Sequence, residues 1–205
     1  MLRDRGFFFG ERPVITARVH LRNRGQMSEF PKLTLVLGGT SSGKSAFAET
    51  LAVDSGLPKT YLATAIAEGA EMQAKIARHK ARRDAGWRTV EAQLDLCKPL
   101  QNAVRGQVIL LDCVSVWLAN QMARTPTIAG ATDNLCTELS RCEARVIVVS
   151  NDVSGSLVPT NEIARDFQRA LGELNQRLAI QCDVVVSITA GLPMVLKGQL
   201  PDYAP

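Results

Sequence analysis

The stretch Gly38-Gly39-Thr40-Ser41-Ser42-Gly43-Lys44-Ser45 decides the fold of this chain. It matches the G-x-x-x-x-G-K-[ST] pattern of a phosphate-binding loop, in which glycines let successive backbone N–H groups point at phosphate oxygens. The apolar run Leu33–Leu37 precedes the loop and a helical pattern follows it, which is the order of strand, loop and helix that the motif requires. The sequence therefore predicts that this loop binds a nucleoside triphosphate.

Individual residues of the loop have separate predicted roles. Lys44 can reach the β- and γ-phosphates, and the hydroxyl of Ser45 can be a ligand of Mg²⁺. The helix that begins near Lys44 adds the positive end of its dipole. We therefore assign the whole loop to nucleotide binding and Ser45 also to the metal; its members are Gly38, Gly39, Thr40, Ser41, Ser42, Gly43, Lys44 and Ser45.

The bulk composition is that of an ordinary globular protein. The chain has 205 residues, of which 46% are apolar and 21% are charged, enough for one α/β domain with a large core. Its net charge of +4 equals the contribution of residues 1–26, where six arginines outnumber Asp4 and Glu11, so the remaining residues sum to zero. A neutral body with a basic tail is weak support for nucleic-acid binding, and we expect no nucleic-acid partner.

The ends and the cysteines bear on where the protein works. We expect residues 1–30 to be a disordered extension, with Met27 as the candidate natural start, and the domain to span 31–205. No run approaches 18 consecutive apolar residues, so no membrane span is predicted. The five cysteines show neither a C-x-x-C pair nor a histidine at metal spacing, which favours reduced thiols in a cytoplasmic protein.

Short apolar runs alternate with helical patterns from residue 33 onward. Strands are expected at Leu33–Leu37, Thr60–Ala63, Val108–Asp112, Val146–Ser150 and Val184–Ile188, with a further candidate at Met194–Lys197; helices are expected near 44–54, 70–84, 114–123, 132–143 and 161–181. The runs are nearly continuous in Val, Ile and Leu, as in a parallel sheet that is covered on both faces. The prediction is a single-domain α/β fold of the P-loop NTPase type, with a mostly parallel, doubly wound sheet and helices on both faces.

The helix expected at 161–181 has the clearest pattern of the chain. Asn161 is a plausible N-cap, and Pro159 provides the break before it. One apolar stripe follows from residues spaced at helical intervals, namely Ile163, Phe167, Leu171, Leu174 and Leu178. We expect this stripe to face the sheet.

Ligands of doubly wound sheets bind at the carboxyl ends of the strands, which makes polar residues there candidates for function. Asp112 ends the run Val108–Leu111, where P-loop proteins place a carboxylate that holds Mg²⁺. Asn151-Asp152 follows the strand that ends at Ser150, and Glu91 follows the short extended segment Trp87–Val90. A helix cap is the alternative for Asp112, and a polar loop is the alternative for the others.

His79 is the candidate nucleophile. It lies in the segment Lys75–Arg83, which holds six basic residues in nine and could either accept a triphosphate or be a solvated helix face. Neighbouring cations disfavour a protonated imidazole, and this would keep His79 nucleophilic toward phosphorus. The alternative is a surface or structural histidine. His20, the other histidine, lies in the basic tail.

In their order and spacing these segments resemble the bifunctional adenosylcobinamide kinase / adenosylcobinamide-phosphate guanylyltransferase family of cobalamin biosynthesis. The resemblance runs from about Leu33 to Lys197. It is carried by the phosphate-binding loop, Tyr61-Leu62-Ala63-Thr64-Ala65, Ile76-Ala77-Arg78-His79-Lys80, Trp87-Arg88-Thr89-Val90-Glu91, Leu111-Asp112-Cys113, Trp117-Leu118-Ala119-Asn120, Val149-Ser150-Asn151-Asp152, Val158-Pro159, Leu174-Asn175-Gln176-Arg177-Leu178-Ala179 and Gly191-Leu192-Pro193.

The resemblance implies two reactions. In the first, a nucleoside triphosphate, ATP or GTP, phosphorylates the aminopropanol hydroxyl of adenosylcobinamide. In the second, His79 attacks the α-phosphate of GTP, and the GMP–histidine intermediate passes GMP to adenosylcobinamide phosphate to give adenosylcobinamide-GDP. The resemblance also implies a homo-oligomer and further nucleotide contacts at Ala63, Thr64, Ala65, Lys80, Ala81, Arg82, Arg83, Glu91 and Asp112.

Three positions depart from the family pattern. Ser41 stands where the family usually has Arg, and Asp152 and Ser154 stand in a segment that is usually Asn-Glu-Val-Gly. A missing cation beside the phosphates weakens binding by about 1–3 kcal/mol, so the balance of the two activities could differ. Two rival functions remain: a simple small-molecule kinase in which His79 is structural, and a non-enzymatic nucleotide-dependent binding protein.

Overall fold

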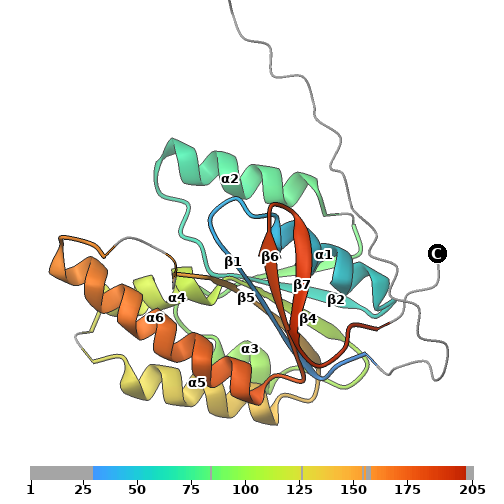
Figure 1. The fold of residues 1–205 in the computed structure, drawn as a ribbon. Coiled ribbons are helices and arrows are strands. Elements are labelled where there is room, and N and C mark those ends of the chain that lie inside the picture. The colour runs from blue at the N-terminus through green and yellow to red at the C-terminus, as the bar shows by residue number, and fades with distance from the viewer. Residues whose placement is uncertain (1–29, 84, 126, 154, 156–157, 202–205) are drawn as a thin grey trace, which may run out of the picture.

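A seven-stranded sheet runs through the centre of the molecule (Figure 1). The computed structural model describes residues 30–201, apart from residues 84, 126, 154 and 156–157. The extension expected at residues 1–30, with its candidate start at Met27, lies outside the described residues except for Phe30. The strands are β1 (Leu33–Gly38), β2 (Lys59–Ala63), β3 (Trp87–Glu91), β4 (Val108–Asp112), β5 (Arg145–Asn151), β6 (Val184–Thr189) and β7 (Leu192–Lys197). The helices are α1 (Lys44–Asp54), α2 (Gly69–Ala81), α3 (Cys97–Gln101), α4 (Val114–Met122), α5 (Ala129–Arg141) and α6 (Glu162–Gln181).

The strand order confirms the predicted sheet. The order is β3-β2-β4-β5-β1-β6-β7, and every neighbouring pair is parallel except β6 and β7. Strand β7 is antiparallel because only Ala190 and Gly191 separate it from β6, and a parallel strand would need a long crossover. Both residues have positive φ, 52° and 80°, which suits a tight hairpin turn.

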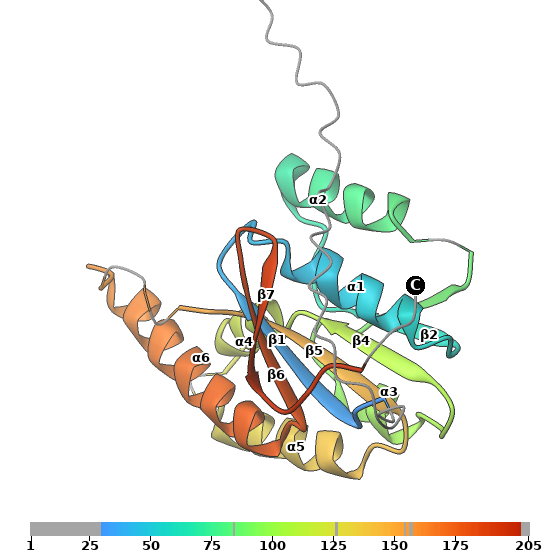
Figure 2. The same ribbon diagram turned by 45° about the vertical axis from the view of Figure 1, so that its right-hand side comes forward.

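Helices cover both faces of the sheet, as the continuous apolar strands predict (Figures 1 and 2). Helix α1 packs on one face through Ala48, Leu51 and Ala52, and α2 lies over α1, farther from the sheet. Helices α3 to α6 pack on the other face and form the larger core with alternate residues of the same strands. The central strands β1, β4, β5 and β6 are thus buried from both sides, whereas the edge strands β3 and β7 are mostly exposed.

Four local features differ from the prediction. Helix α3 was not expected, because its five residues are too few to show a helical period. Helix α5 begins at Ala129, before the expected residue 132, and the segment expected to be merely extended at Trp87–Val90 is strand β3. The stripe of α6 is shorter than expected, since Leu171, Leu174 and Leu178 are buried but Ile163 is 74% exposed. Ile163 is in the first turn of α6 and contributes nothing to the buried stripe.

No helix in the described part of the chain is both long enough and apolar enough to cross a membrane.

Asn161 is the N-cap of α6, as predicted, and its Oδ1 accepts a hydrogen bond from the Ile163 N–H at 2.8 Å. The substitution Asn161→Ala leaves that N–H without its side-chain acceptor, and we expect the free energy of unfolding to fall by about 0.5–2 kcal/mol. Urea unfolding followed by circular dichroism measures the change. Asn161→Asp keeps the acceptor and should retain most of the stability; an Ala variant as stable as the parent would contradict the assignment.

Candidate active site

The phosphate-binding loop Gly38–Ser45 connects β1 to α1, as the motif predicts. Two of its residues have positive φ, Ser41 at 58° and Gly43 at 96°, so the chain reverses tightly before the first turn of α1. The ammonium group of Lys44 donates a hydrogen bond to the Gly39 carbonyl at 3.0 Å, across the mouth of the loop. The loop therefore has the backbone shape and the cation that a phosphate site needs.

Backbone contacts hold the loop on two sides. The N–H of Gly191, at the β6–β7 turn, donates to the Ser42 carbonyl at 2.8 Å, and the N–H of Asp152 donates to the Gly38 carbonyl at 3.0 Å. Gly38 has no room for a side chain, because a Cβ there would lie 2.4 Å from Ser42 Oγ and 2.7 Å from the Ile188 carbonyl oxygen. The β6–β7 hairpin is thus a support of the loop that the sequence did not predict.

Sheet register brings the predicted strand-end residues to one edge. Asp112 of β4 pairs with Ala63 of β2, and Ala63 pairs in turn with Glu91 of β3. Asn151, the last residue of β5, is level with Gly38 of the neighbouring strand β1, where the phosphate-binding loop begins. The structure therefore places Ala63, Glu91, Asp112 and the loop at the same edge of the sheet.

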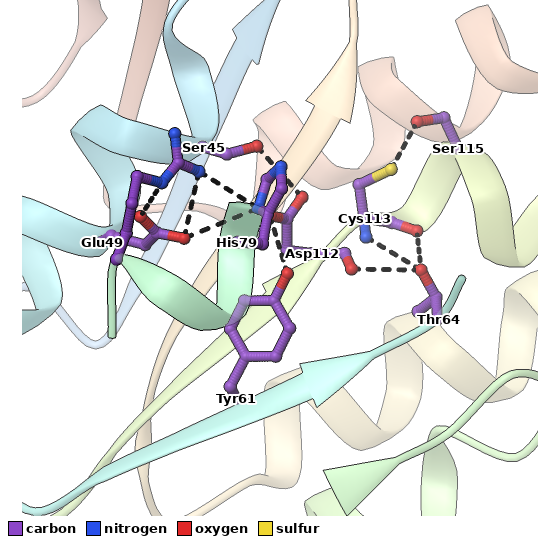
Figure 3. Close-up of polar contacts among 9 residues, drawn as sticks. Ser45, Glu49, Tyr61, Thr64, His79, Asp112, Cys113 and Ser115 are labelled. Carbon is purple, nitrogen blue, oxygen red and sulfur yellow. Dashed lines mark hydrogen bonds and ion pairs between the residues drawn. The ribbon is translucent and has the colours of Figure 1, made fainter. Parts of the chain in front are cut away.

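The carboxylate of Asp112 receives hydrogen bonds from two other elements (Figure 3). Ser45 Oγ donates to Asp112 Oδ1 at 3.3 Å, and the Tyr61 hydroxyl donates to Asp112 Oδ2 at 3.0 Å. Burial, and then the negative charge of Asp112, raise the pKa of Tyr61 well above its ordinary value, so the phenol stays protonated and remains a donor. Asp112 is therefore held in one orientation, with its side chain against the start of α1.

Thr64 positions the backbone that follows Asp112. Its hydroxyl is within 3.2 Å of the carbonyl oxygens of Asp112 and Cys113 and accepts from the Cys113 N–H at 2.9 Å (Figure 3). The peptide bond between Asp112 and Cys113 is cis. Asn120 donates to the Thr64 carbonyl at 2.9 Å, while Thr64 itself is fully buried and the next residue, Ala65, is half-buried. The Thr64 side chain thus fixes the backbone at Asp112 and Cys113 and does not face the phosphate-binding loop.

His79 of α2 points toward two carboxylates, whereas the sequence suggested an imidazole among cations (Figure 3). Its Nδ1 lies 3.6 Å from Glu49 Oε1 and 3.6 Å from Asp112 Oδ2. The cation beside it is Arg82, whose Nη2 is 3.1 Å from the same nitrogen and whose guanidinium pairs with Glu49 at 3.2 Å. The prediction missed this arrangement because both carboxylates are brought in by other elements, α1 and β4.

Two further basic residues near His79, Lys80 and Arg83, contact an aromatic ring or line a pocket. The Arg83 guanidinium stacks on the Tyr61 ring, 3.5 Å from its centroid. Lys80 and Arg83 line a shallow pocket of about 340 Å³ together with Trp87, Thr89 and Glu91. Ala81 is exposed at the end of α2. Several of the predicted nucleotide-contacting residues therefore lie around or beside His79.

The oxygen donors at the loop fit a divalent cation. Ser45 Oγ and Asp112 Oδ1 are adjacent, and Mg²⁺ prefers hydroxyl and carboxylate oxygens. Ser42 Oγ, elsewhere in the loop, is buried without a hydrogen-bond partner. The residues assigned to the metal from the sequence, Ser45 and Asp112, are thus in direct contact.

Two residues of this site were missed by sequence reasoning, Glu49 and Tyr61. Glu49 follows Ser45 by four positions and so lies on the same face of α1, a spacing that could have indicated it. Tyr61 precedes Ala63 by two positions in β2 and therefore faces the same side of the sheet. Neither residue type signals phosphate chemistry by itself, and only the packing of α1 on β2 and β4 shows their place.

Fold and site together define a nucleotide-binding protein of the P-loop class. The chain belongs to the cobinamide kinase / cobinamide phosphate guanyltransferase family, whose model matches residues 34–196. Its members named below are transferases, and the chain is an enzyme of that class.

Two relatives agree with this family, and one solved structure shares the fold. The chain is 42% identical over 168 residues to the bifunctional adenosylcobalamin biosynthesis protein CobP of Pseudomonas aeruginosa, covering 80% of this chain and 97% of the relative. It is 32% identical over 181 residues to the corresponding protein CobU of Escherichia coli K12, covering 80% and 99%. A solved structure from Pyrococcus horikoshii OT3 shares the fold, with 11% identity, a TM-score of 0.52 and coverage of 84% of this chain and 89% of that one.

A methyl group at Gly38 tests the shape of the loop. We expect Gly38→Ala to displace Ser42 or the backbone at Ile188, and to weaken triphosphate binding and stability by about 1–3 kcal/mol, the usual effect of overpacking. Gly130→Ala, in α5 and outside the phosphate-binding loop, is the control, because a Cβ at Gly130 has nothing within 4 Å. Calorimetric titration with a non-hydrolysable triphosphate and thermal unfolding measure both effects. Equal behaviour of the two variants would show that the contact at Gly38 is unimportant.

Proposed function

We propose that the enzyme carries out two reactions on a corrinoid substrate. It first phosphorylates the aminopropanol hydroxyl of adenosylcobinamide with ATP or GTP, and then transfers GMP from GTP to the resulting phosphate, giving adenosylcobinamide-GDP. The family and its bifunctional relatives support the pair of reactions. The observation that carries the proposal is the placement of His79 within 3.6 Å of Asp112, beside the phosphate-binding loop.

The kinase reaction is assigned to the loop. Its backbone N–H groups and Lys44 would bind the triphosphate, while the acceptor hydroxyl approaches the γ-phosphorus in line with the leaving oxygen. Ser45 and Asp112 would hold Mg²⁺, which when bound neutralises charge on the phosphates. These residues orient the reactants rather than form bonds to them, which is why the chemistry needs few side chains.

The guanylyl transfer is assigned to His79. The lone pair of one imidazole nitrogen forms a bond to the α-phosphorus of GTP, and the bond from that phosphorus to the bridging oxygen breaks, so that its electrons leave with pyrophosphate. A phosphate oxygen of adenosylcobinamide phosphate then attacks the same phosphorus, and the N–P electrons return to the ring. Arg82, Arg83 and Lys80 supply positive charge beside this nitrogen for the phosphates.

The shallow pocket beside β3 is assigned to the nucleotide. Lys80, Arg83 and Glu91 line it with both signs of charge, and Trp87 gives it an aromatic surface. Such a pocket can stack a base and accept hydrogen bonds from its N–H groups. A homo-oligomer acting in the cytoplasm is part of the same proposal and follows from the family resemblance alone.

The covalent step is tested with GTP labelled at the α-phosphate. After incubation with Mg²⁺ and denaturation, we expect label on the protein that acid removes and alkali does not, as for a phosphoramidate. His79→Ala should abolish the label, and His20→Ala, which changes the other histidine of the chain, should not. A wild-type protein without label, or a His79→Ala variant with undiminished label, would favour the simple kinase.

The metal assignment is tested at Ser45. Removing a hydroxyl that contacts the cation is worth about 1–3 kcal/mol, so Ser45→Ala should raise the Mg²⁺ concentration needed for half-maximal rate about 10- to 100-fold in both reactions. Ser55→Ala, at the other end of α1, is the matched control, since its hydroxyl bonds the Ala52 carbonyl. Unchanged Mg²⁺ dependence in the Ser45 variant would remove Ser45 from the metal site.

A further inference from the structure

Asn151 is a polar residue at the carboxyl edge of the sheet that none of the steps above uses. It is the last residue of β5, and β5 lies between β1, which leads into the phosphate-binding loop, and β4, which ends at Asp112. Asn151 is half-buried, and within the described part of the chain its carboxamide makes no hydrogen bond. It is thus an unengaged polar group between the two parts of the proposed site.

The side chain of Asn151 lies on the α1 side of the sheet, because successive residues of a strand point to opposite faces. The preceding residue, Ser150, faces α6, since its hydroxyl donates to Asn175 Oδ1 at 2.6 Å. Val149, two residues before Asn151, packs in the core that includes α1. Asp112 is on that same side, where its carboxylate contacts the start of α1. Asn151 is therefore on the face of the sheet where the phosphate-binding loop and Asp112 meet.

The register of the strands places Asn151 beyond Asp112 and beside the loop. Asp112 pairs with Val149, so Asn151 lies two residues farther along, about 6.6 Å at the rise of a parallel strand. Gly38, the first residue of the loop, pairs with Asn151 itself. The carboxamide is consequently next to the mouth of the loop and past the level of the contact between Ser45 and Asp112.

Helix α6 holds the end of β5 in place. Asn175 Nδ2 donates to the Asn151 carbonyl at 2.9 Å, and Gln168 Nε2 donates to the Val153 carbonyl at 2.9 Å. The N–H of Asp152 donates to the first carbonyl of the phosphate-binding loop at 3.0 Å. The backbone on both sides of Asn151 is therefore fixed, and a ligand that binds the carboxamide has only one side chain to order.

The terminal phosphate of a nucleoside triphosphate is the group that would reach this position. A loop of this kind binds the α- and β-phosphates through its backbone N–H groups, and its lysine reaches the β- and γ-phosphates. Ser45 and Asp112, the proposed metal ligands, mark the end of the loop at which the β- and γ-phosphates share a cation. The strand that ends between this pair and the loop is β5. A carboxamide has two N–H donors, which suit the anionic oxygens of a phosphate.

We propose that Asn151 is a further binding residue for the triphosphate: its carboxamide donates a hydrogen bond to an oxygen of the γ-phosphate and makes the site prefer a triphosphate to the diphosphate. This inference rests on the proposed binding of a nucleotide at the loop. When the γ-phosphoryl group has been transferred, the contact is lost, which favours release of the diphosphate product.

Calorimetric titration tests the contact with two probes, a non-hydrolysable GTP analogue and GDP, each with Mg²⁺. Asn151→Ala should weaken binding of the analogue about 10- to 100-fold, the range for a hydrogen bond to a charged group, and leave the affinity for GDP unchanged. Asn134→Ala, which removes an exposed carboxamide from α5, is the matched control. An Asn151→Ala protein that keeps the parent's ratio of the two affinities would overturn the inference.

Asn151→Asp distinguishes a phosphate contact from a metal ligand. The substitution keeps the size of the side chain but replaces its N–H donors with a carboxylate, which repels a phosphate. We therefore expect a larger loss of affinity for the analogue than in Asn151→Ala. If the side-chain oxygen of Asn151 held the cation instead, the carboxylate would keep or strengthen binding, and that result would overturn the inference.

Two further observations complete the test. Parallel loss of analogue and GDP binding in both variants would show damage to the loop as a whole and contradict a contact specific to the γ-phosphate. In ¹⁵N-labelled parent protein, which needs no substitution, the carboxamide resonance of Asn151 should shift with the analogue and not with GDP; equal shifts would count against the contact. Parent protein that binds neither probe would refute the nucleotide site itself, a failure distinct from binding of both probes without a difference at Asn151.

Discussion

The carboxylate of Asp112 is the contact on which the site depends, because side chains from three other elements meet there. Ser45 comes from α1, Tyr61 from β2 and His79 from α2, and each approaches a carboxylate that β4 holds at the edge of the sheet. Ser45 lies on α1 and His79 on α2, and Asp112 is the strand residue that contacts both of them. Its position follows from the parallel register, which sets the end of β4 level with the end of β2.

Several charged side chains are buried at the carboxyl edge of the sheet, so their positive and negative charges must nearly balance. Asp112 and Glu49 are largely buried, and Arg82 and Arg83 lie over them, one paired with Glu49 and the other stacked on Tyr61. An unpaired carboxylate in such a position would cost several kcal/mol, whereas pairing through α2 offsets that cost and holds α2 over α1. The basic density of Lys75–Arg83, which could have been a solvated face, thus serves in part to balance carboxylates of other elements.

The sequence predicted those features of the fold and the site that are determined by residues close together in the chain. The phosphate-binding loop, the strands and the Asn161 cap are each determined within a few residues, and the alternation of strands and helices limits the topology to a doubly wound sheet. Asp112 could be found because a strand end is itself a local feature. Glu49 and Tyr61 could not, since a Glu in a helix and a Tyr in a strand are ordinary until packing brings them to the same carboxylate. The environment of His79 was misjudged for the same reason: its neighbours in sequence are cations, but its neighbours in space include two acids.

The two proposed reactions place different demands on the same loop. Backbone N–H groups and Lys44 bind phosphate oxygens without regard to which phosphorus reacts, so the loop alone cannot choose between γ-phosphoryl and guanylyl transfer. The choice must come from the group that approaches in line, the acceptor hydroxyl at one end of the triphosphate or the His79 ring at the other. His79 lies on α2, the helix farthest from the sheet on this face. Among the described residues, His79 contacts Glu49 of α1 and Asp112 of β4, and Arg82, at the end of α2, also pairs with Glu49. The contacts that orient the imidazole are therefore also the contacts that determine whether α2 is placed for the second reaction.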